Sequence, residues 1–211
     1  MTTRHQPAAG GSPADGLVRA GEADIDVLSQ VIADSFLDLA PCQWLIGDRA
    51  ARREIFPRFF RMYVVHAIAD GLVYTTPDRI AAALWIPRTG PAAPPEGYDE
   101  ELAEVTGRWA ERFVVFDGEL DAHHLDGVAH HHLAILAVRP DWQGRGIGTA
   151  LLDAHHAVLD QDSTVAFLEA SDERNRGLYL RHGYTDYGSP IRLPDGPSMY
   201  PMTRQPRARG G

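Results

Sequence analysis

Residues Gln143 to Gly148 read Gln-Gly-Arg-Gly-Ile-Gly and lie between an apolar run and an amphipathic run. The run before them, 132–138, predicts a strand, and the run after them, 147–159, predicts a helix. A strand, a glycine-rich turn and a helix point several backbone N–H groups and a helix N-terminus at one place, which is where a phosphate or diphosphate binds. The sequence therefore predicts a phosphorylated cofactor.

Two common phosphate-binding loops fit this turn poorly. A Walker A loop ends in Gly-Lys-Ser/Thr, and the chain contains no lysine. A dinucleotide fingerprint reads Gly-x-Gly-x-x-Gly after the first strand, with an acidic residue closing the next strand. Here the spacing is Gly-x-Gly-x-Gly, and it occurs deep in the chain.

The segment from Val138 to Gly148 resembles the diphosphate loop of the GNAT superfamily of acyl-CoA-dependent N-acetyltransferases. Its pattern is Gln/Arg-x-x-Gly-x-Gly/Ala, preceded by Val-Arg-Pro, and the chain fills every position. Downstream, 169–175 and 178–184 resemble the exit of a later strand and the Asn…Tyr-x-x-x-Gly-Phe/Tyr segment of that family. The resemblance covers about residues 17–203. Within it, 194–197 and 202–206 resemble the end of puromycin N-acetyltransferase-type actinobacterial enzymes.

This resemblance implies acetyl-CoA as co-substrate and assigns residues to it. The backbone of the central strand would hold pantetheine, the glycine turn would hold the diphosphate, and an asparagine on a later helix would hydrogen-bond pantetheine. The implied cofactor-binding residues are Leu136, Ala137, Val138, Gln143, Gly144, Arg145, Gly146, Ile147, Gly148, Thr149 and Asn175. The acceptor-facing half of the chain matches less clearly, so the resemblance does not supply the substrate.

Acyl transfer from a thioester to an amine needs a neutral, aimed amine and a protonated leaving thiolate. The resemblance makes Tyr179 the general acid, whereas packing of a short helix is the structural alternative. The general base stays open. Period-two alternation places His130 and His132 on one face of the central strand and His131 on the other, so one of them is a candidate. Glu169 is a further candidate, and water can also carry the proton.

Several histidines raise the question of a metal site. They are His123, His124, His130, His131, His132, His155 and His156. Adjacent histidines point apart on a strand or a helix, so these pairs chelate a metal badly, and a zinc site needs tightly defined ligand spacing. We predict no metal.

The order of elements predicts one α/β domain. Its sheet is expected to be mixed but mostly antiparallel and flanked by helices, with splayed central strands as the GNAT resemblance implies. The domain spans 16–203, between disordered tails at 1–15 and 204–211. Strands are expected at 17–19, 71–76, 79–86, 132–138, 164–169, 184–188 and 199–203, helices at 22–36, 49–69, 98–116, 147–159 and 175–182, and an irregular segment at 117–131.

Charge and cysteine content limit the partners and the location. The 20 basic residues are all arginine and face 29 acidic ones, giving a net charge of −9. Such a surface excludes nucleic acid as a natural partner and favours a cationic amine. Cys42 is the only cysteine, so an intramolecular disulfide is impossible. No apolar stretch approaches the roughly 20 residues that span a bilayer. We expect a cytoplasmic monomer or homodimer.

The predicted function is an acetyl-CoA-dependent N-acetyltransferase that acts on a primary amine of a small molecule, an antibiotic or a metabolite. Two alternatives remain at this point. One is an acyl-CoA-binding regulatory module without turnover. The other is a protein or peptide N-acetyltransferase, which would need an open groove. The helical insert at 98–131 favours a covered pocket for a small molecule.

Overall fold

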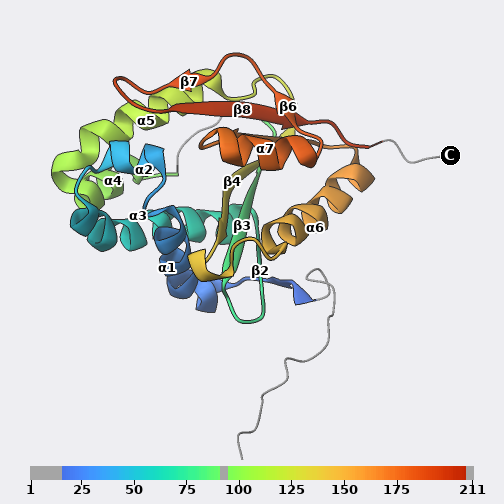
Figure 1. Ribbon diagram of the computed structural model, residues 1–211, viewed down its shortest axis with the longest axis horizontal. Coiled ribbons are helices and arrows are strands. Elements are labelled where there is room, and N and C mark those ends of the chain that lie inside the picture. The colour runs from blue at the N-terminus through green and yellow to red at the C-terminus, as the bar shows by residue number, and fades with distance from the viewer. Residues whose placement is uncertain (1–15, 91–94, 208–211) are drawn as a thin grey trace, which may run out of the picture.

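One eight-stranded sheet organises the chain (Figure 1). The computed structural model describes residues 16–90 and 95–207, so the tail expected at 1–15 and the last four residues of the tail expected at 204–211 lie outside the described residues. Only β4 and β5 are parallel among the pairs in the order β1-β2-β3-β4-β5-β8-β6, and β7 pairs with β8. The mixed, mostly antiparallel sheet is therefore confirmed. The strands are β1 (Val18–Arg19), β2 (Leu72–Thr75), β3 (Ala81–Arg88), β4 (His130–Val138), β5 (Val165–Ala170), β6 (Thr185–Asp186), β7 (Ile191–Arg192) and β8 (Ser198–Arg204).

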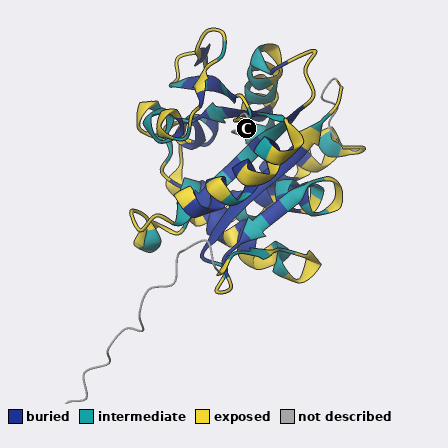
Figure 2. Ribbon diagram, turned by 90° about the vertical axis from the view of Figure 1, so that its right-hand side faces the viewer, coloured by how far each residue is buried: buried dark blue, intermediate teal, exposed yellow. Residues whose placement is uncertain are grey.

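Helices cover both faces of this sheet. On one face lie α1 and α3, while α6 and α7 pack on the other (Figures 1 and 2). The strands between them are largely buried. The helices are α1 (Ile25–Phe36), α2 (Ala40–Leu45), α3 (Arg49–Asp70), α4 (Tyr98–Thr106), α5 (Ala110–His123), α6 (Ile147–Asp162) and α7 (Glu173–Arg181).

Strand β3 shows how the two cores are built. Ala82, Leu84 and Ile86 point into the core under α1 and α3. Ala81, Ala83 and Trp85 point into the core under α6 and α7. Both sets are buried, because a strand covered on both faces is apolar at every position and not only at alternate ones.

Strand β4 contains a bulge at Ala134. Along the β3–β4 pair, Leu84 lies opposite Ile135 but Trp85 lies opposite Leu133, so Ala134 is an extra residue on β4. The bulge reverses the side-chain alternation. Leu133 points into the α6 core, whereas Ile135 and Ala137 point into the α1 and α3 core. Without the extra residue these three side chains would share a face.

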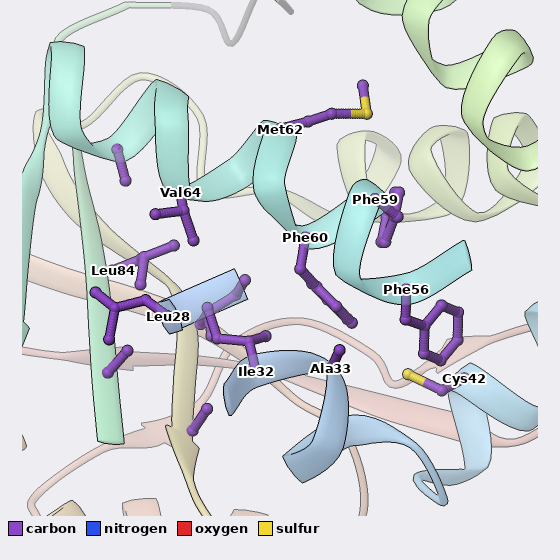
Figure 3. Packing of buried hydrophobic residues seen from close by; sticks show 14 of the residues in the cluster. Leu28, Ile32, Ala33, Cys42, Phe56, Phe59, Phe60, Met62, Val64 and Leu84 are labelled. Carbon is purple, nitrogen blue, oxygen red and sulfur yellow. The ribbon is translucent and has the colours of Figure 1, made fainter. Parts of the chain in front are cut away.

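The core beneath α1 and α3 is rich in aromatic rings (Figure 3). Phe56, Phe59 and Phe60 of α3 contact one another edge-on or tilted, and Phe59 also meets Phe113 of α5 with ring centroids 4.7 Å apart. Leu28 and Ile32 of α1 complete the packing. These contacts fix α1, α3 and α5 as one layer on the sheet.

Several expected element bounds differ from the structure. The helix expected at 98–116 is two helices, because Gly107 has φ 55° and ψ −126°, a conformation that interrupts an α-helix. Helix α5 then continues to His123, so much of the segment expected to be irregular is helical. Strand β4 begins at His130, α2 and β7 were not expected, and Arg204, placed in the C-terminal tail, is the buried last residue of β8.

Arg52 of α3 joins the chain segments that connect α1, α2 and α3. Its side chain is 4% exposed, and its guanidinium donates to the carbonyls of Leu37, Ile46 and Gly47 at 2.7, 2.6 and 3.1 Å. Those carbonyls would lose their charged donor if the side chain were shortened.

We therefore expect Arg52→Ala to lower the free energy of unfolding by about 3 kcal/mol, as measured by urea denaturation. The exposed neighbour on the same helix is a matched control: Arg53→Ala should cost about 0.5 kcal/mol or less. Equal losses in the two variants would contradict the role assigned to Arg52.

Candidate active site

A cavity of about 690 Å³ opens where β4 and β5 separate. The two strands pair only from His130 to His132 on β4 and from Val165 to Phe167 on β5. Beyond this point β4 stays paired with β3 and β5 stays paired with β8. The β4 edge from 133 to 138 therefore has no strand beside it and lines the cavity. This is the predicted splay, and it leaves backbone N–H and C=O groups available to a ligand.

The glycine turn closes one end of the cavity. Gly144 and Gly146 have φ of 75° and 81°, and nothing lies within 4 Å of a Cβ placed on either. Gly146 is the N-cap of α6, so the unpaired N–H groups of the first helical turn are at the same end. Positive φ and open space together let a phosphate approach the backbone closely.

Two polar side chains of the turn serve different purposes. Gln143 donates from Nε2 to the carbonyl of Val138 at 3.0 Å, which ties the turn to the end of β4. Arg145 stacks on Trp142, with its guanidinium carbon 4.6 Å from the ring centroid, and donates to the carbonyl of Asp141. Gln143 lines the cavity and Arg145 does not.

Helix α7 contributes the next wall. Asp172 caps it by accepting a hydrogen bond from the Asn175 backbone N–H at 2.7 Å, and the Asn175 side chain donates to Ser171 Oγ at 2.7 Å. One turn further on, Tyr179 is buried and lines the cavity. Burial, and then the charge of Asp172, raises the pKa of the Tyr179 hydroxyl, so it stays protonated at neutral pH.

The opposite end of the cavity is apolar and aromatic. It is formed by α1, α2, α3 and α5. The apolar side chains there are Phe36, Leu39, Leu45, Phe59, Phe60, Tyr63, Phe116 and Leu120.

A cluster of three histidines and one glutamate lies at this apolar end. Nε2 of His132 is 2.8 Å from Oε2 of Glu169, and Nδ1 of His124 is 3.5 Å from Oε1. His124 comes from the C-terminal end of α5, where it is the C-cap, while Glu169 lies on β5, two residues beyond the last pair with β4. The rings of His124, His130 and His132 all contact Phe167.

Glu169 is a buried carboxylate with a strongly displaced pKa. Burial alone raises the pKa of its carboxyl, but the charge of His132 and the nearby His124 lower it more strongly, to about 2. Its side chain is 7% exposed. The carboxylate is therefore ionised at neutral pH and holds the imidazole of His132 through Nε2.

Most of the predicted site residues line this one cavity. They are His132, Leu136, Ala137, Val138, Gln143, Gly144, Gly146, Ile147, Gly148, Thr149, Asn175 and Tyr179. Arg145 and His130 do not line it. His130 is buried behind His124, with its Nε2 3.1 Å from Nε2 of His124. The expected alternation is confirmed, because His131 faces the other way and contacts His155 of α6 at 2.9 Å.

Sequence reasoning missed His124 as a neighbour of Glu169 and missed most of the apolar wall. Phe59 and Tyr63 of α3 both line the cavity. The helical spacing of Phe113, Phe116 and Leu120 in α5 was the available signal, since it extends the apolar face beyond the expected helix end.

Comparison with known proteins connects this geometry to a family. Residues 107–186 match the model of the acetyltransferase (GNAT) domain. The whole fold is similar to a crystal structure described as histone acetyltransferase HPA2 and related acetyltransferase from Corynebacterium glutamicum. That likeness covers 93% of this chain and 98% of the other, with a TM-score of 0.64 and 21% identity. The chain has the GNAT acetyltransferase fold.

Two other similarities were found, one in sequence and one in fold. A 59-residue segment is 39% identical to aminoglycoside 2'-N-acetyltransferase of Mycolicibacterium fortuitum and spans 28% of this chain and 30% of that protein. An arylalkylamine N-acetyltransferase 2 from Aedes aegypti has a TM-score of 0.62 at 12% identity, covering 90% of this chain and 98% of its own. At such identities the solved structures show the fold alone. Among residues 16–90 and 95–207, no helix has the length and apolar character needed to cross a membrane.

The glycine turn gives a direct test of the cofactor end of this GNAT fold. We expect Gly146→Asp to weaken acetyl-CoA binding at least about 100-fold, because a carboxylate would occupy the space in front of the α6 N-terminus and repel the diphosphate. Isothermal titration calorimetry measures the dissociation constant.

Two controls separate charge from backbone strain. Gly146→Asn places a neutral side chain of similar size at the same positive φ, which asparagine tolerates, and should bind acetyl-CoA better than Gly146→Asp. Gly188→Asp imposes the same strain on an exposed loop between β6 and β7, at φ 64°, and should bind like the unaltered protein. Normal binding by Gly146→Asp would show that the turn is not the diphosphate site.

Proposed function

We propose that this protein is an acetyl-CoA-dependent N-acetyltransferase that acts on the primary amine of a small molecule. The observation that carries the proposal is one cavity that joins an unpaired β4 edge, a glycine turn at a helix N-terminus and the buried hydroxyl of Tyr179. The match of residues 107–186 to the GNAT domain supports the same activity.

The donor end fits the elongated shape of coenzyme A. The free edge of β4 offers hydrogen-bonding groups from Leu136 to Val138 for pantetheine, and Gly144 and Gly146 to Thr149 line the part of the cavity where the diphosphate would lie. Arg174 and Arg181 of α7 also line the cavity and add positive charge for phosphates. When bound, acetyl-CoA supplies the thioester whose acetyl group passes to the amine.

Tyr179 is the general acid in this proposal. Its hydroxyl is protonated at neutral pH because burial raises its pKa, and it lines the same cavity as the β4 edge. A protonated hydroxyl beside the leaving sulfur donates the proton that the thiolate needs.

His132 and Glu169 receive the amine at the other end. Glu169 accepts a hydrogen bond from Nε2 of His132, which leaves Nδ1 of a neutral His132 as a proton acceptor. That Nδ1 is buried and has no hydrogen-bond partner among the described residues. A carboxylate that orients an imidazole in this way makes it a competent base for the attacking amine.

The acceptor is a small amine with an apolar part. The wall formed by Phe59, Phe60 and Tyr63 suits an apolar or aromatic group, and the ionised Glu169 attracts the ammonium form. Helix α5 covers this end, which favours a small molecule over a protein substrate. The partial similarity to an aminoglycoside acetyltransferase and the puromycin-type resemblance of residues 194–197 and 202–206 support a small-molecule acceptor as well.

The test is release of free coenzyme A thiol from acetyl-CoA over a panel of amines. We expect release that depends on a primary amine, with aromatic and alkyl amines turned over faster than peptides that expose an N-terminus. Acetyl-CoA binding without amine-dependent release from any panel member would favour a regulatory module over an enzyme. Faster turnover of peptides would favour a protein acetyltransferase.

Replacing the proposed acid separates chemistry from binding. We expect Tyr179→Phe to lower kcat at least about 100-fold while the dissociation constant of acetyl-CoA changes less than about threefold, since only the proton donor is lost. Stopped assays of thiol release and calorimetry give the two values.

Tyr184→Phe is the matched control for this variant. The Tyr184 ring lies 5.7 Å from the Tyr179 ring, but its hydroxyl contacts His156 at 3.0 Å, inside the core. This control should keep kcat within about twofold of the unaltered protein. Similar losses in both variants would identify a packing role for Tyr179 and not an acid role.

A further inference from the structure

The hydrogen bonds behind Glu169 determine which nitrogen of each histidine carries a proton. Nδ1 of His130 lies 2.7 Å from the carbonyl oxygen of Val128, which only accepts, so this nitrogen donates. A neutral His130 then presents Nε2 as an acceptor. Nε2 of His124, 3.1 Å away, must donate to it.

This series of hydrogen bonds leaves a lone pair of His124 facing the carboxylate of Glu169. In a neutral His124 that donates through Nε2, Nδ1 carries a lone pair, and Nδ1 is 3.5 Å from Oε1 of Glu169. Oε1 is buried and has no hydrogen-bond partner among the described residues. Two electron-rich atoms this close repel each other unless a cation lies between them, either a proton that makes His124 the ionised partner of Glu169 or a metal ion.

The same carboxylate holds a second imidazole on its other oxygen. Nε2 of His132 is 2.8 Å from Oε2, and the three ligand atoms of His124, His132 and Glu169 all lie within 4.8 Å of one another. Ligands of a tetrahedral metal with bonds of about 2.0–2.1 Å are roughly 3.3 Å apart. The separations from His132 to Oε2 and from His124 to Oε1, 2.8 and 3.5 Å, lie on either side of that value and end on the two different oxygens of the carboxylate.

We propose that His124, His132 and Glu169 form a binding site for a divalent transition metal, best suited to Zn²⁺. Two imidazoles and one carboxylate are a known zinc ligand set, with a fourth position left to water or substrate. His132 and Glu169 line the cavity, so that fourth position opens toward the acceptor end.

The neighbours of the cluster match the outer shell of a metal site. His124 is oriented by His130, which is in turn oriented by the carbonyl of Val128. Metal-binding histidines commonly donate their second N–H to such an acceptor, which fixes the ring and the tautomer. His130, which does not reach the cavity, acquires a positioning role in this arrangement.

Zinc at this site would regulate the proposed reaction. It would bind Nε2 of His132 and the Glu169 carboxylate, and so engage the two side chains that we assign to the acceptor amine. We therefore expect Zn²⁺ to raise the KM for the amine and to leave acetyl-CoA binding unchanged. This kinetic consequence rests on the proposed function, whereas zinc binding itself does not.

A second group of possible ligands must be removed before the test. Asp153 and His156 of α6 and His182 after α7 also have ligand atoms within 4.8 Å of one another. They lie on the α6 side of the sheet, away from Glu169. All measurements therefore use the full chain carrying Asp153→Asn, which weakens that group.

Calorimetric titration of the chelator-treated Asp153→Asn protein with Zn²⁺ alone is the first measurement. We expect one zinc per chain, and a dissociation constant at least about tenfold weaker when Glu169→Gln or His124→Gln is added. An unchanged constant in both added variants would overturn the site, as would an absence of zinc binding in Asp153→Asn. An absence of zinc binding would mean that the cation between His124 and Glu169 is a proton on the imidazole.

Two further measurements distinguish loss of the metal site from misfolding of a variant and from failure of the proposed function. A thermal shift with acetyl-CoA in chelator should be the same with and without Glu169→Gln, which shows that the variant folds. The Asp153→Asn protein loaded with Co²⁺ should show the absorption bands of tetrahedral Co²⁺. Their absence would contradict the ligand set, and this measurement needs no variant at Glu169. If no amine is acetylated in chelator while zinc still binds, the proposed function fails and the metal site stands.

Discussion

The separation of β4 from β5 is the constraint on which the rest of the structure depends. β4 must leave its parallel neighbour after His132 and still pair with β3 along its whole length. The extra residue at Ala134 makes this possible, because a bulge bends a strand without ending its ladder. It also turns the side chains of Ile135 and Ala137 toward α1 and α3, so the core is filled while the backbone edge stays open to the cavity.

The two ends of that cavity have opposite electrostatic character. At one end, Gly146 and the first turn of α6 present N–H groups and the positive end of a helix dipole. At the other end, Glu169 is an ionised carboxylate surrounded by imidazoles and aromatic rings. Under the proposed function, an anionic donor and a cationic acceptor would be drawn to different ends, and each end would disfavour the wrong ligand. The net charge of −9 agrees with the proposed cationic acceptor.

Sequence-based prediction succeeded where the controlling interactions are local. The helical period of α1, α3 and α6 and the glycine spacing after β4 are local patterns, and each led to the correct element. It failed where one residue or a distant partner decided the outcome. Gly107 divides the expected helix at 98–116 because of a single backbone conformation, and β7 is two residues long and exists only through its pairing with β8. Arg204 belongs to β8 through its pairing with Ala166 of β5, and its guanidinium also pairs with Asp160 of α6 at 2.8 Å.

The sequence by itself determined the fold class, through the order of elements and the GNAT resemblance, and it also determined the glycine turn and the position of Tyr179 on a short helix after β5, through local spacing. Only the tertiary structure decided which groups meet at the acceptor end. Adjacent histidines do point apart, as the strand period requires, but His124 reaches Glu169 because α5 runs on to His123 and β5 turns away from β4 just before Glu169. The physical reason is that the period of a helix or a strand depends on neighbouring residues in the sequence, whereas the convergence of α5, β4 and β5 depends on a bulge and on packing against Phe167.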